Sequence, residues 1–155
     1  MREFGERNAS EEDPADATEI RKTLVRVVAS PVFAASPKLA SFLRYVVEAT
    51  LEGRADRLKG YTIGVEALGR AEDFDPQIDP IVRVEAGRLR AALARYYAGP
   101  GRDDPVVIDL PRGGYVPKFR QRHFPVGLRK YSYSGRREVF RRTLRRWRLL
   151  AKLAT

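Results

Sequence analysis

The clearest pattern along the chain is a pair of hydrophobic stripes at helical spacing, bounded by Ser, Pro and Gly. The first stripe follows Thr18, the predicted N-cap, and stops at Ser30-Pro31. The second follows Ser36-Pro37, a cap residue with Pro at the first helical position, and ends at Gly53. The apolar positions are Ile20, Leu24, Val27 and Val28 in the first predicted helix, and Leu39, Phe42, Leu43, Val46, Val47 and Leu51 in the second.

Two more helical segments are predicted after the second stripe. Residues 61–68, with Gly69 behind them, form a short helix, although their Thr, Ile and Val content leaves a strand as an alternative. Asp79-Pro80 repeats the signal of a cap followed by proline. From there a long helix is predicted to run to about Tyr97, where Gly99-Pro100-Gly101 ends it.

A β-hairpin is predicted after the long helix. Residues 106–110 and 115–119 are short β-rich runs, and Pro111-Arg112-Gly113-Gly114 supplies the turn between them. The fold is therefore predicted to be mainly α with a small β-hairpin. A long basic helix followed by a hairpin is typical of a winged helix-turn-helix, in which one element enters a groove of DNA and the other reaches the adjacent backbone.

The composition predicts one domain with a tail at each end. A chain of 155 residues that is 43% hydrophobic suits a single soluble domain. Residues 1–17 are predicted to be a disordered acidic leader, residues 18–119 the winged-helix domain, and residues 120–155 a basic tail. The absence of cysteine excludes disulfides and thiolate metal sites. Without a signal peptide or a run of 18 apolar residues, the chain is predicted to be cytoplasmic, either soluble or peripheral at the inner face of the membrane.

The positive charge is concentrated in the tail. The formal net charge is +10, but residues 120–155 hold 12 of the 30 Lys and Arg residues and only one of the 20 Asp and Glu residues. The rest of the chain therefore holds 18 basic and 19 acidic side chains and is close to neutral. Because the domain has no net basic charge, it needs a local basic surface to recognise an anionic partner.

The predicted helix over residues 79–97 has an apolar face and an outer face that bears arginine. At 100° per residue, Arg83 and Arg90 are predicted to face outward, together with Gly87. Guanidinium groups can fork onto guanine or clamp phosphates, so Arg83 and Arg90 are predicted contacts to double-stranded DNA. Gly87 would let the helix backbone approach DNA closely. Ala91 and Ala94 complete the outer face, and the apolar side consists of Ile81, Val82, Ala86, Leu89, Ala92, Leu93 and Tyr96.

Four further basic residues of the domain fall into two groups. Arg112, at the hairpin tip, is predicted to reach a phosphate or the minor groove, with a solvated turn residue as the alternative. Lys118, in the second strand, is added to the predicted DNA contacts. Arg88 and Arg95 are instead predicted to flank the core and to pair with acids such as Glu85.

These segments resemble a known family. Arg88-Leu89-Arg90, followed by Gly113-Gly114-Tyr115, resembles the end of an OmpR/PhoB-type winged helix. A closer resemblance is to the N-terminal region of bacterial proteins often labelled adenylate-cyclase-like or TolB-like, through residues 42–48 (FLRYVVE), 61–66 (YTIGVE) and 74–90 (FDPQIDPIVRVEAGRLR). The resemblance covers about residues 20–119.

The resemblance implies a transcriptional effector domain. The helix that begins at Tyr61 would be the first helix of the helix-turn-helix, residues 79–97 the recognition helix, and residues 106–119 the wing. Proteins of this group commonly continue into a membrane helix and a tetratricopeptide or TolB-like portion. The chain is therefore interpreted as a shortened member that has kept a basic approach to the membrane.

The basic tail is predicted to form an amphipathic helix after Ser134, with Trp147 on its apolar side. Such a helix can lie on an anionic membrane surface or neutralise nucleic-acid phosphates, since both use the same charges. A third interpretation is a docking helix that covers apolar surface of the domain. The basic residues of interest are Arg141, Arg142, Arg145, Arg146 and Arg148.

The sequence offers little for catalysis. His123 is the one histidine and is predicted to lie at the surface, while Asp73, Asp75 and Asp79 are predicted to serve turns and caps rather than a metal loop. No cofactor or metal is expected, and the chain is predicted not to be an enzyme. The predicted function is that of a DNA-binding winged-helix transcriptional regulator or regulatory module. The alternative is a non-catalytic signalling adaptor that binds a protein partner through this fold and a membrane surface through the tail.

Overall fold

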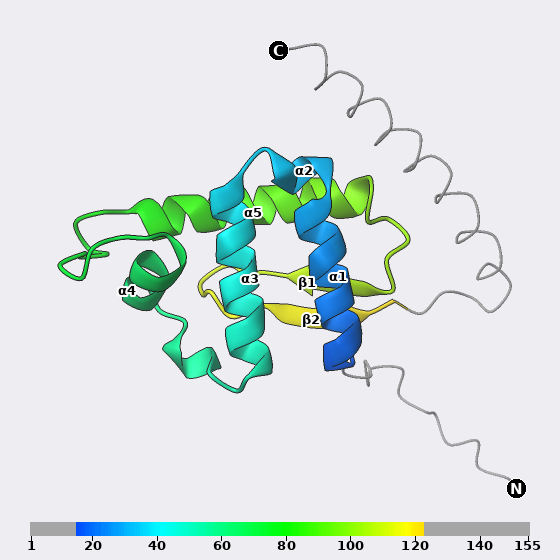
Figure 1. Ribbon diagram of the computed structural model, residues 1–155, viewed down its shortest axis with the longest axis horizontal. Helices are drawn as coiled ribbons and strands as arrows, with labels where there is room; N and C mark the ends of the chain where they lie inside the picture. Colours follow the sequence, from blue (N-terminus) through cyan, green and yellow to red (C-terminus); the bar gives the residue numbers. More distant parts are fainter. Residues whose placement is uncertain (1–14, 123–155) are drawn as a thin grey trace, which may run out of the picture. The chain divides into compact units, whose positions relative to one another are not determined.

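The computed structural model describes residues 15–122, which are mainly helical and end in one small antiparallel hairpin (Figure 1). The prediction of a mainly α fold with a small hairpin is confirmed. The leader up to residue 14 and the predicted tail helix lie outside the described residues. In chain order the elements are α1 Ala17–Ala29, α2 Pro31–Ala34, α3 Pro37–Leu51, η1 Ala55–Arg57, α4 Gly60–Thr62, η2 Ile63–Ala67, α5 Ile81–Ala98, β1 Val106–Asp109 and β2 Lys118–Gln121.

Helix α1 buries most of its predicted stripe but begins earlier than predicted. Asp16, rather than Thr18, is the N-cap, because its backbone is extended and Ala17 is already helical. Hydrophobic spacing does not fix a helix boundary to within a residue or two, which is why the cap prediction was wrong. The helix ends at Ala29, at the predicted Ser30-Pro31 stop. Its buried apolar residues are Ile20, Leu24 and Val27, and Val28 is half-buried.

A one-turn helix, α2, follows directly, and the hydrophobic spacing does not predict it. It places Phe33 in the core with only 1% of its surface exposed. A four-residue helix is too short to show a period in sequence. Helix α3 then begins as predicted, with Ser36 as N-cap and Pro37 as its first residue. Its predicted stripe is buried apart from Leu51, which is half-buried.

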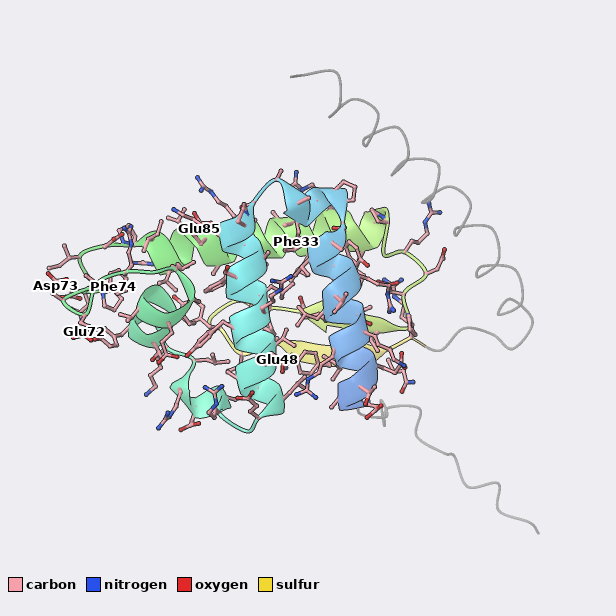
Figure 2. All side chains as sticks on the ribbon, in the orientation of Figure 1. Phe33, Glu48, Glu72, Asp73, Phe74 and Glu85 are labelled. Atoms are coloured by element: carbon pink, nitrogen blue, oxygen red, sulfur yellow. The ribbon has the colours of Figure 1, made fainter. Side chains whose placement is uncertain are left out.

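Residues 60–67 are helical, which decides between the helix and the strand that the sequence leaves open. A turn of α4 continues into η2, where the Leu68 N–H donates to the Ile63 carbonyl, five residues back, as in a π-helix. This wide turn places the buried Gly64 against the ring of Phe74, which belongs to the loop between η2 and α5 (Figure 2). The loop therefore packs on the backbone of η2.

Replacing Gly64 with Ala should lower the free energy of unfolding by about 1 to 3 kcal/mol, the usual cost of overpacking. A Cβ there would lie 2.3 Å from the nearest ring atom of Phe74, so the ring and its loop would have to move. Gly87→Ala on α5 is the matched control. Its Cβ would meet open space, and Ala in an exposed helical position should stabilise the protein by roughly 0.5 to 1 kcal/mol. Urea unfolding of both full-length variants measures these effects, and a Gly64→Ala variant as stable as the parent would contradict the packing.

Hydrogen bonds and an ion pair fix the segment between η2 and α5. The Tyr61 hydroxyl donates to the Glu72 carbonyl at 2.9 Å, and Arg70 pairs with Asp79 at 3.0 Å. Asp79 also accepts the N–H of Ile81 at 3.0 Å. The prediction that Asp79 is the N-cap and Pro80 the first helical residue is wrong by one residue, because Pro80 is the N-cap and α5 begins at Ile81.

Helix α5 presents its predicted apolar side to the core. Glu85 is also on this side, where its side chain is 4% exposed and accepts a 2.8 Å hydrogen bond from Arg88. The predicted pairing of Arg88 with this acid is confirmed, and it compensates the buried carboxylate. The buried apolar residues are Val82, Ala86, Leu89, Ala92, Leu93 and Tyr96, and Ile81 is half-buried.

The hairpin forms as predicted, but its second strand lies further along the chain. The register pairs Val106 with Gln121, Val107 with Arg120, Ile108 with Phe119 and Asp109 with Lys118. The predicted strand over residues 115–119 is wrong in its first half, because residues 110–117 form a loop. Pro117 has no N–H to donate to a ladder, and the side chain of Arg90 binds carbonyls of this loop.

A tyrosine of α5 closes the outer edge of β1. The Ile108 N–H donates to the Tyr97 hydroxyl at 2.8 Å, and burial raises the pKa of Tyr97 to about 12. Arg122, just after β2, lies over the Tyr97 ring with its guanidinium carbon 5.5 Å from the ring centre. Tyr97 therefore joins α5 to β1 and to the residue that follows β2.

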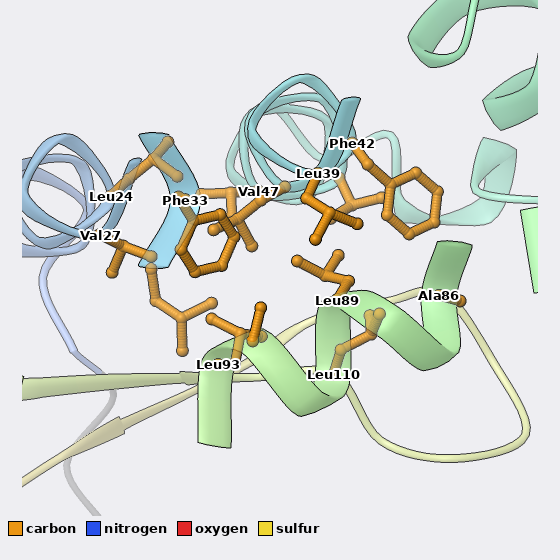
Figure 3. Close-up of a cluster of buried hydrophobic side chains, with 14 of the residues drawn as sticks. Leu24, Val27, Phe33, Leu39, Phe42, Val47, Ala86, Leu89, Leu93 and Leu110 are labelled. Carbon is orange, nitrogen blue, oxygen red and sulfur yellow. The ribbon is translucent and has the colours of Figure 1, made fainter. Parts of the chain in front are cut away.

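The core lies between α1, α2 and α3 on one side and α5 with the hairpin on the other (Figure 3). Phe33, Phe42, Leu89 of α5 and Leu110, which follows β1, belong to one cluster of buried side chains. Each fully buried side chain of this size contributes about 1.5 to 3 kcal/mol relative to an exposed one. Within residues 15–122, no helix has both the length and the apolar character needed to cross a membrane.

A buried polar network joins α1, α5 and the segment before β1. The Tyr96 hydroxyl donates to one carboxylate oxygen of Asp104 at 2.5 Å, and Nε of Arg26 donates to the other at 3.1 Å. Arg26 also donates to the Thr23 hydroxyl at 2.9 Å. Burial, and then the hydrogen bond to Asp104, raise the pKa of Tyr96 above its usual range. Asp104 therefore links the C-terminal part of α5 to α1.

Candidate nucleic-acid interface

Arg83 extends from the N-terminal part of α5 into solvent. It is exposed, as predicted, and makes no ion pair with any other residue between 15 and 122. The helix contains one acid, Glu85, which is buried and paired with Arg88. Arg95 is exposed and has no ion-pair partner in this part of the chain, so the predicted pairing of Arg95 is wrong. The exposed charges of α5 are therefore all positive.

Small residues occupy the middle of this exposed face. Gly87, Ala91 and Ala94 are exposed, as predicted, and a Cβ on Gly87 would meet open space. Val84, on the same face, is 45% exposed. Another molecule can therefore come close to the helix backbone, but this part of the face offers no donors for reading base edges.

Arg90 does not extend freely from the helix, and the prediction that it faces solvent is wrong. It is half-buried, and its guanidinium donates to three backbone carbonyls of the hairpin loop. The bonds run from Nε to Leu110 at 2.9 Å, and from Nη2 to Pro111 at 3.1 Å and to Gly114 at 2.9 Å. These carbonyls lie outside the two strands, so they are free to accept hydrogen bonds from the guanidinium in place of water. Arg90 therefore joins helix and hairpin.

The tip of the hairpin loop carries an exposed arginine, Arg112, and residues on both sides of it make contacts with the helices. Arg112 is exposed and is followed by Gly113, whose φ of +88° lies in the left-handed region that favours glycine. Beyond the tip, the Tyr115 ring packs edge-on against Phe42, with 6.4 Å between ring centres. Lys118 is exposed at the start of β2, directly opposite Asp109 in the ladder. Asp109 weakens the positive potential around Lys118, so Arg112 is the stronger candidate of the two.

The hydrogen bonds of Arg90 place the tip of the hairpin loop beside α5. Arg83 lies seven residues before Arg90, or about 10 Å along the helix axis, on nearly the same side of α5. Arg112 lies between Pro111 and Gly114, whose carbonyls both accept from Arg90. A major groove is about 12 Å wide, so a helix with a flanking loop is a shape that fits a duplex. The roles of Arg83, Gly87, Arg112 and Lys118 as DNA contacts remain predictions.

Carboxylates in the loop before α5 serve local structure. Asp75 accepts the N–H of Gln77 at 2.8 Å, and Asp79 accepts the N–H of Ile81 and pairs with Arg70. Asp73, the third member of the series, is exposed. In the described part of the chain, no group of three or more His, Cys, Asp or Glu side chains is placed to hold a metal ion.

The sequence contains a weak signal for the role of Arg90. On a helical wheel Arg90 lies at the border between the apolar and outer faces, where a long side chain can reach a neighbouring element. Nothing in the spacing identifies the carbonyls that it binds, because they lie 20 to 24 residues further along the chain. His123 and the predicted tail residues Arg141, Arg142, Arg145, Arg146 and Arg148 lie outside the described residues.

Comparison with known proteins adds no assignment. No family model, no curated protein and no solved structure matches the chain. The geometry of α5 and the hairpin is therefore the basis for a functional proposal.

Proposed function

We propose that residues 15–122 form a winged-helix DNA-binding module of a transcriptional regulator, with α5 as the recognition helix and the hairpin as the wing. The observation that carries the proposal is the Arg90 contact, which places the hairpin loop alongside α5. Arg83 and Arg112 are both exposed, and neither forms an ion pair with another described residue. Double-stranded DNA is the polyanion whose shape suits a helix flanked by a loop.

The surface favours recognition of the backbone over recognition of sequence. Gly87, Ala91 and Ala94 bring no hydrogen-bond donors to the centre of the exposed face. Arg83 and Arg112 can each donate several N–H groups to phosphate oxygens. Affinity should therefore depend steeply on salt, with modest discrimination between base sequences.

Replacing Arg83 and Arg112 together with Ala should weaken DNA binding by about 2 to 4 kcal/mol, since each charge-assisted contact is worth about 1 to 3 kcal/mol. The slope of log K against log salt should become shallower by about 0.9 for each phosphate contact removed. Fluorescence anisotropy with a labelled duplex measures both quantities. The full chain should be used in a tail-neutralised background, because the tail alone can bind phosphates. In this background Gln replaces Arg129, Lys130, Arg136, Arg137, Arg141, Arg142, Arg145, Arg146, Arg148 and Lys152.

Arg44→Ala is the control, because it removes one arginine from an exposed position of α3, away from α5 and the hairpin loop. It should change affinity by less than about 0.5 kcal/mol, and thermal unfolding should be unchanged for both proteins. Equal affinity of the parent and the Arg83/Arg112 variant in the tail-neutralised background would place DNA contact elsewhere, or exclude it.

A second candidate function, a non-catalytic adaptor for a protein partner, is favoured by one observation. The exposed face of α5 combines Val84 with Gly87, Ala91 and Ala94, so its centre is apolar and smooth. Such a face suits contact with another protein as well as close approach to DNA. An adaptor would show no DNA binding at low salt in the tail-neutralised background, whereas the DNA-binding module would bind most tightly there.

A further inference from the structure

The guanidinium of Arg90 closes the tip of the hairpin loop. Its Nη2 donates to the carbonyls of both Pro111 and Gly114, so one nitrogen spans the two residues between them, Arg112 and Gly113. Its Nε also holds the Leu110 carbonyl. The three bonds lie at 2.9 to 3.1 Å, within the ordinary range for N–H···O bonds.

These bonds leave Arg90 little capacity for another partner. A guanidinium has five N–H groups, and the loop uses the one on Nε and both on Nη2, so only Nη1 is left. A lysine could keep the charge at this position, but its compact ammonium lacks the planar fork that meets three carbonyls. The geometry of the guanidinium, beyond its charge, is therefore matched to the loop.

We infer that Arg90 is a positioning residue that sets the hairpin loop so that Arg112 is presented to DNA, rather than being a DNA contact itself. This inference rests on the proposed function and names how its wing is held. Gly113 and Gly114 make the loop tip intrinsically free in conformation, and a Cβ at either position would meet open space. Without Arg90, the tip would sample many conformations, and Arg112 would lose the ordered position that strong binding requires.

A double-mutant cycle tests the inference in the full chain, in the tail-neutralised background. Arg90→Ala and Arg112→Ala should each weaken duplex binding by roughly 10-fold, and the double variant should be no weaker than about 10-fold. Direct and independent contacts would instead multiply to roughly 100-fold. Arg90→Lys should lose as much affinity as Arg90→Ala, whereas a phosphate contact through charge alone would be largely retained.

NMR relaxation of the backbone amides, recorded without DNA, measures the order of the loop independently of binding. The order parameters of Gly113, Gly114 and Tyr115 should fall in the Arg90→Ala and Arg90→Lys variants and stay unchanged in Arg44→Ala. If Arg90→Ala fails to fold, Arg90→Lys carries both measurements. Additive losses, full affinity of Arg90→Lys, or unchanged order parameters in the loop would each overturn the inference. A parent that binds no DNA would overturn the proposed function, and the relaxation measurement would then decide alone whether Arg90 orders the loop.

Discussion

Replacing Phe42 with Ala should lower the free energy of unfolding by about 3 to 5 kcal/mol, because truncation removes buried apolar surface and leaves a cavity. The Phe42 ring is fully buried, and it packs edge-on against Tyr115 of the hairpin loop. The substitution should therefore loosen the contact between α3 and the loop as well as the core. Urea unfolding of the full chain measures the effect.

Arg44, two residues further along α3, provides the control for this substitution. It is exposed, and Arg44→Ala should change stability by less than about 0.5 kcal/mol. A loss of less than about 1 kcal/mol for Phe42→Ala would mean that the ring is not packed as described.

Replacing Asp104 with Ala should cost about 3 kcal/mol, because it removes the shared acceptor of a buried hydroxyl and a guanidinium. Tyr96 and Arg26 would lose their common partner, and the Tyr96 hydroxyl lies where water cannot easily replace it. The side chain of Arg26 is 40% exposed, so solvent recovers part of its loss. Thermal and urea unfolding of the full chain should show the change.

Two variants separate the parts of this network. Tyr96→Phe removes only the hydroxyl and should cost about 1 to 2 kcal/mol, less than Asp104→Ala. Asp109→Asn, at an exposed position of β1, should be nearly neutral. If Asp104→Ala were no more harmful than Asp109→Asn, the network would make no net contribution to stability.

Local sequence signals account for most of the helices. The stripes of α1 and α3 and the apolar side of α5 predict which residues are buried, because 3.6-residue spacing is a property of the helix itself. The capping pair Ser36-Pro37 predicts the start of α3, because proline suits the first helical position, where its missing N–H costs no hydrogen bond. Hydrophobic spacing does not reveal Phe33 and its one-turn helix, since a single aromatic residue between two turns has no period.

Features that depend on distant contacts could not be predicted in this way. The second strand begins only at Lys118, and the loop before it is held by Arg90, which lies 20 to 24 residues away in sequence from the carbonyls that it binds. On the helical wheel Glu85 falls within the apolar side, between Ala92 and Tyr96, but a carboxylate carries no hydrophobic signal, and it is buried in a pair with Arg88. Residue type and position on the helix therefore indicate the candidate site residues, whereas their division into exposed and structural arginines depends on the folded structure.

The contact between Tyr97 and Ile108 has a consequence for self-association. A two-stranded sheet offers two open edges, and unpaired backbone groups there can recruit another chain into an aggregate. Tyr97 occupies the Ile108 N–H at the outer edge of β1, so an incoming strand cannot form that bond without displacing the hydroxyl. On the other strand, the exposed Lys118 and Arg120 would set like charges against a second copy of the same edge. The hairpin can thus remain a small sheet within this domain instead of becoming a template for intermolecular β-structure.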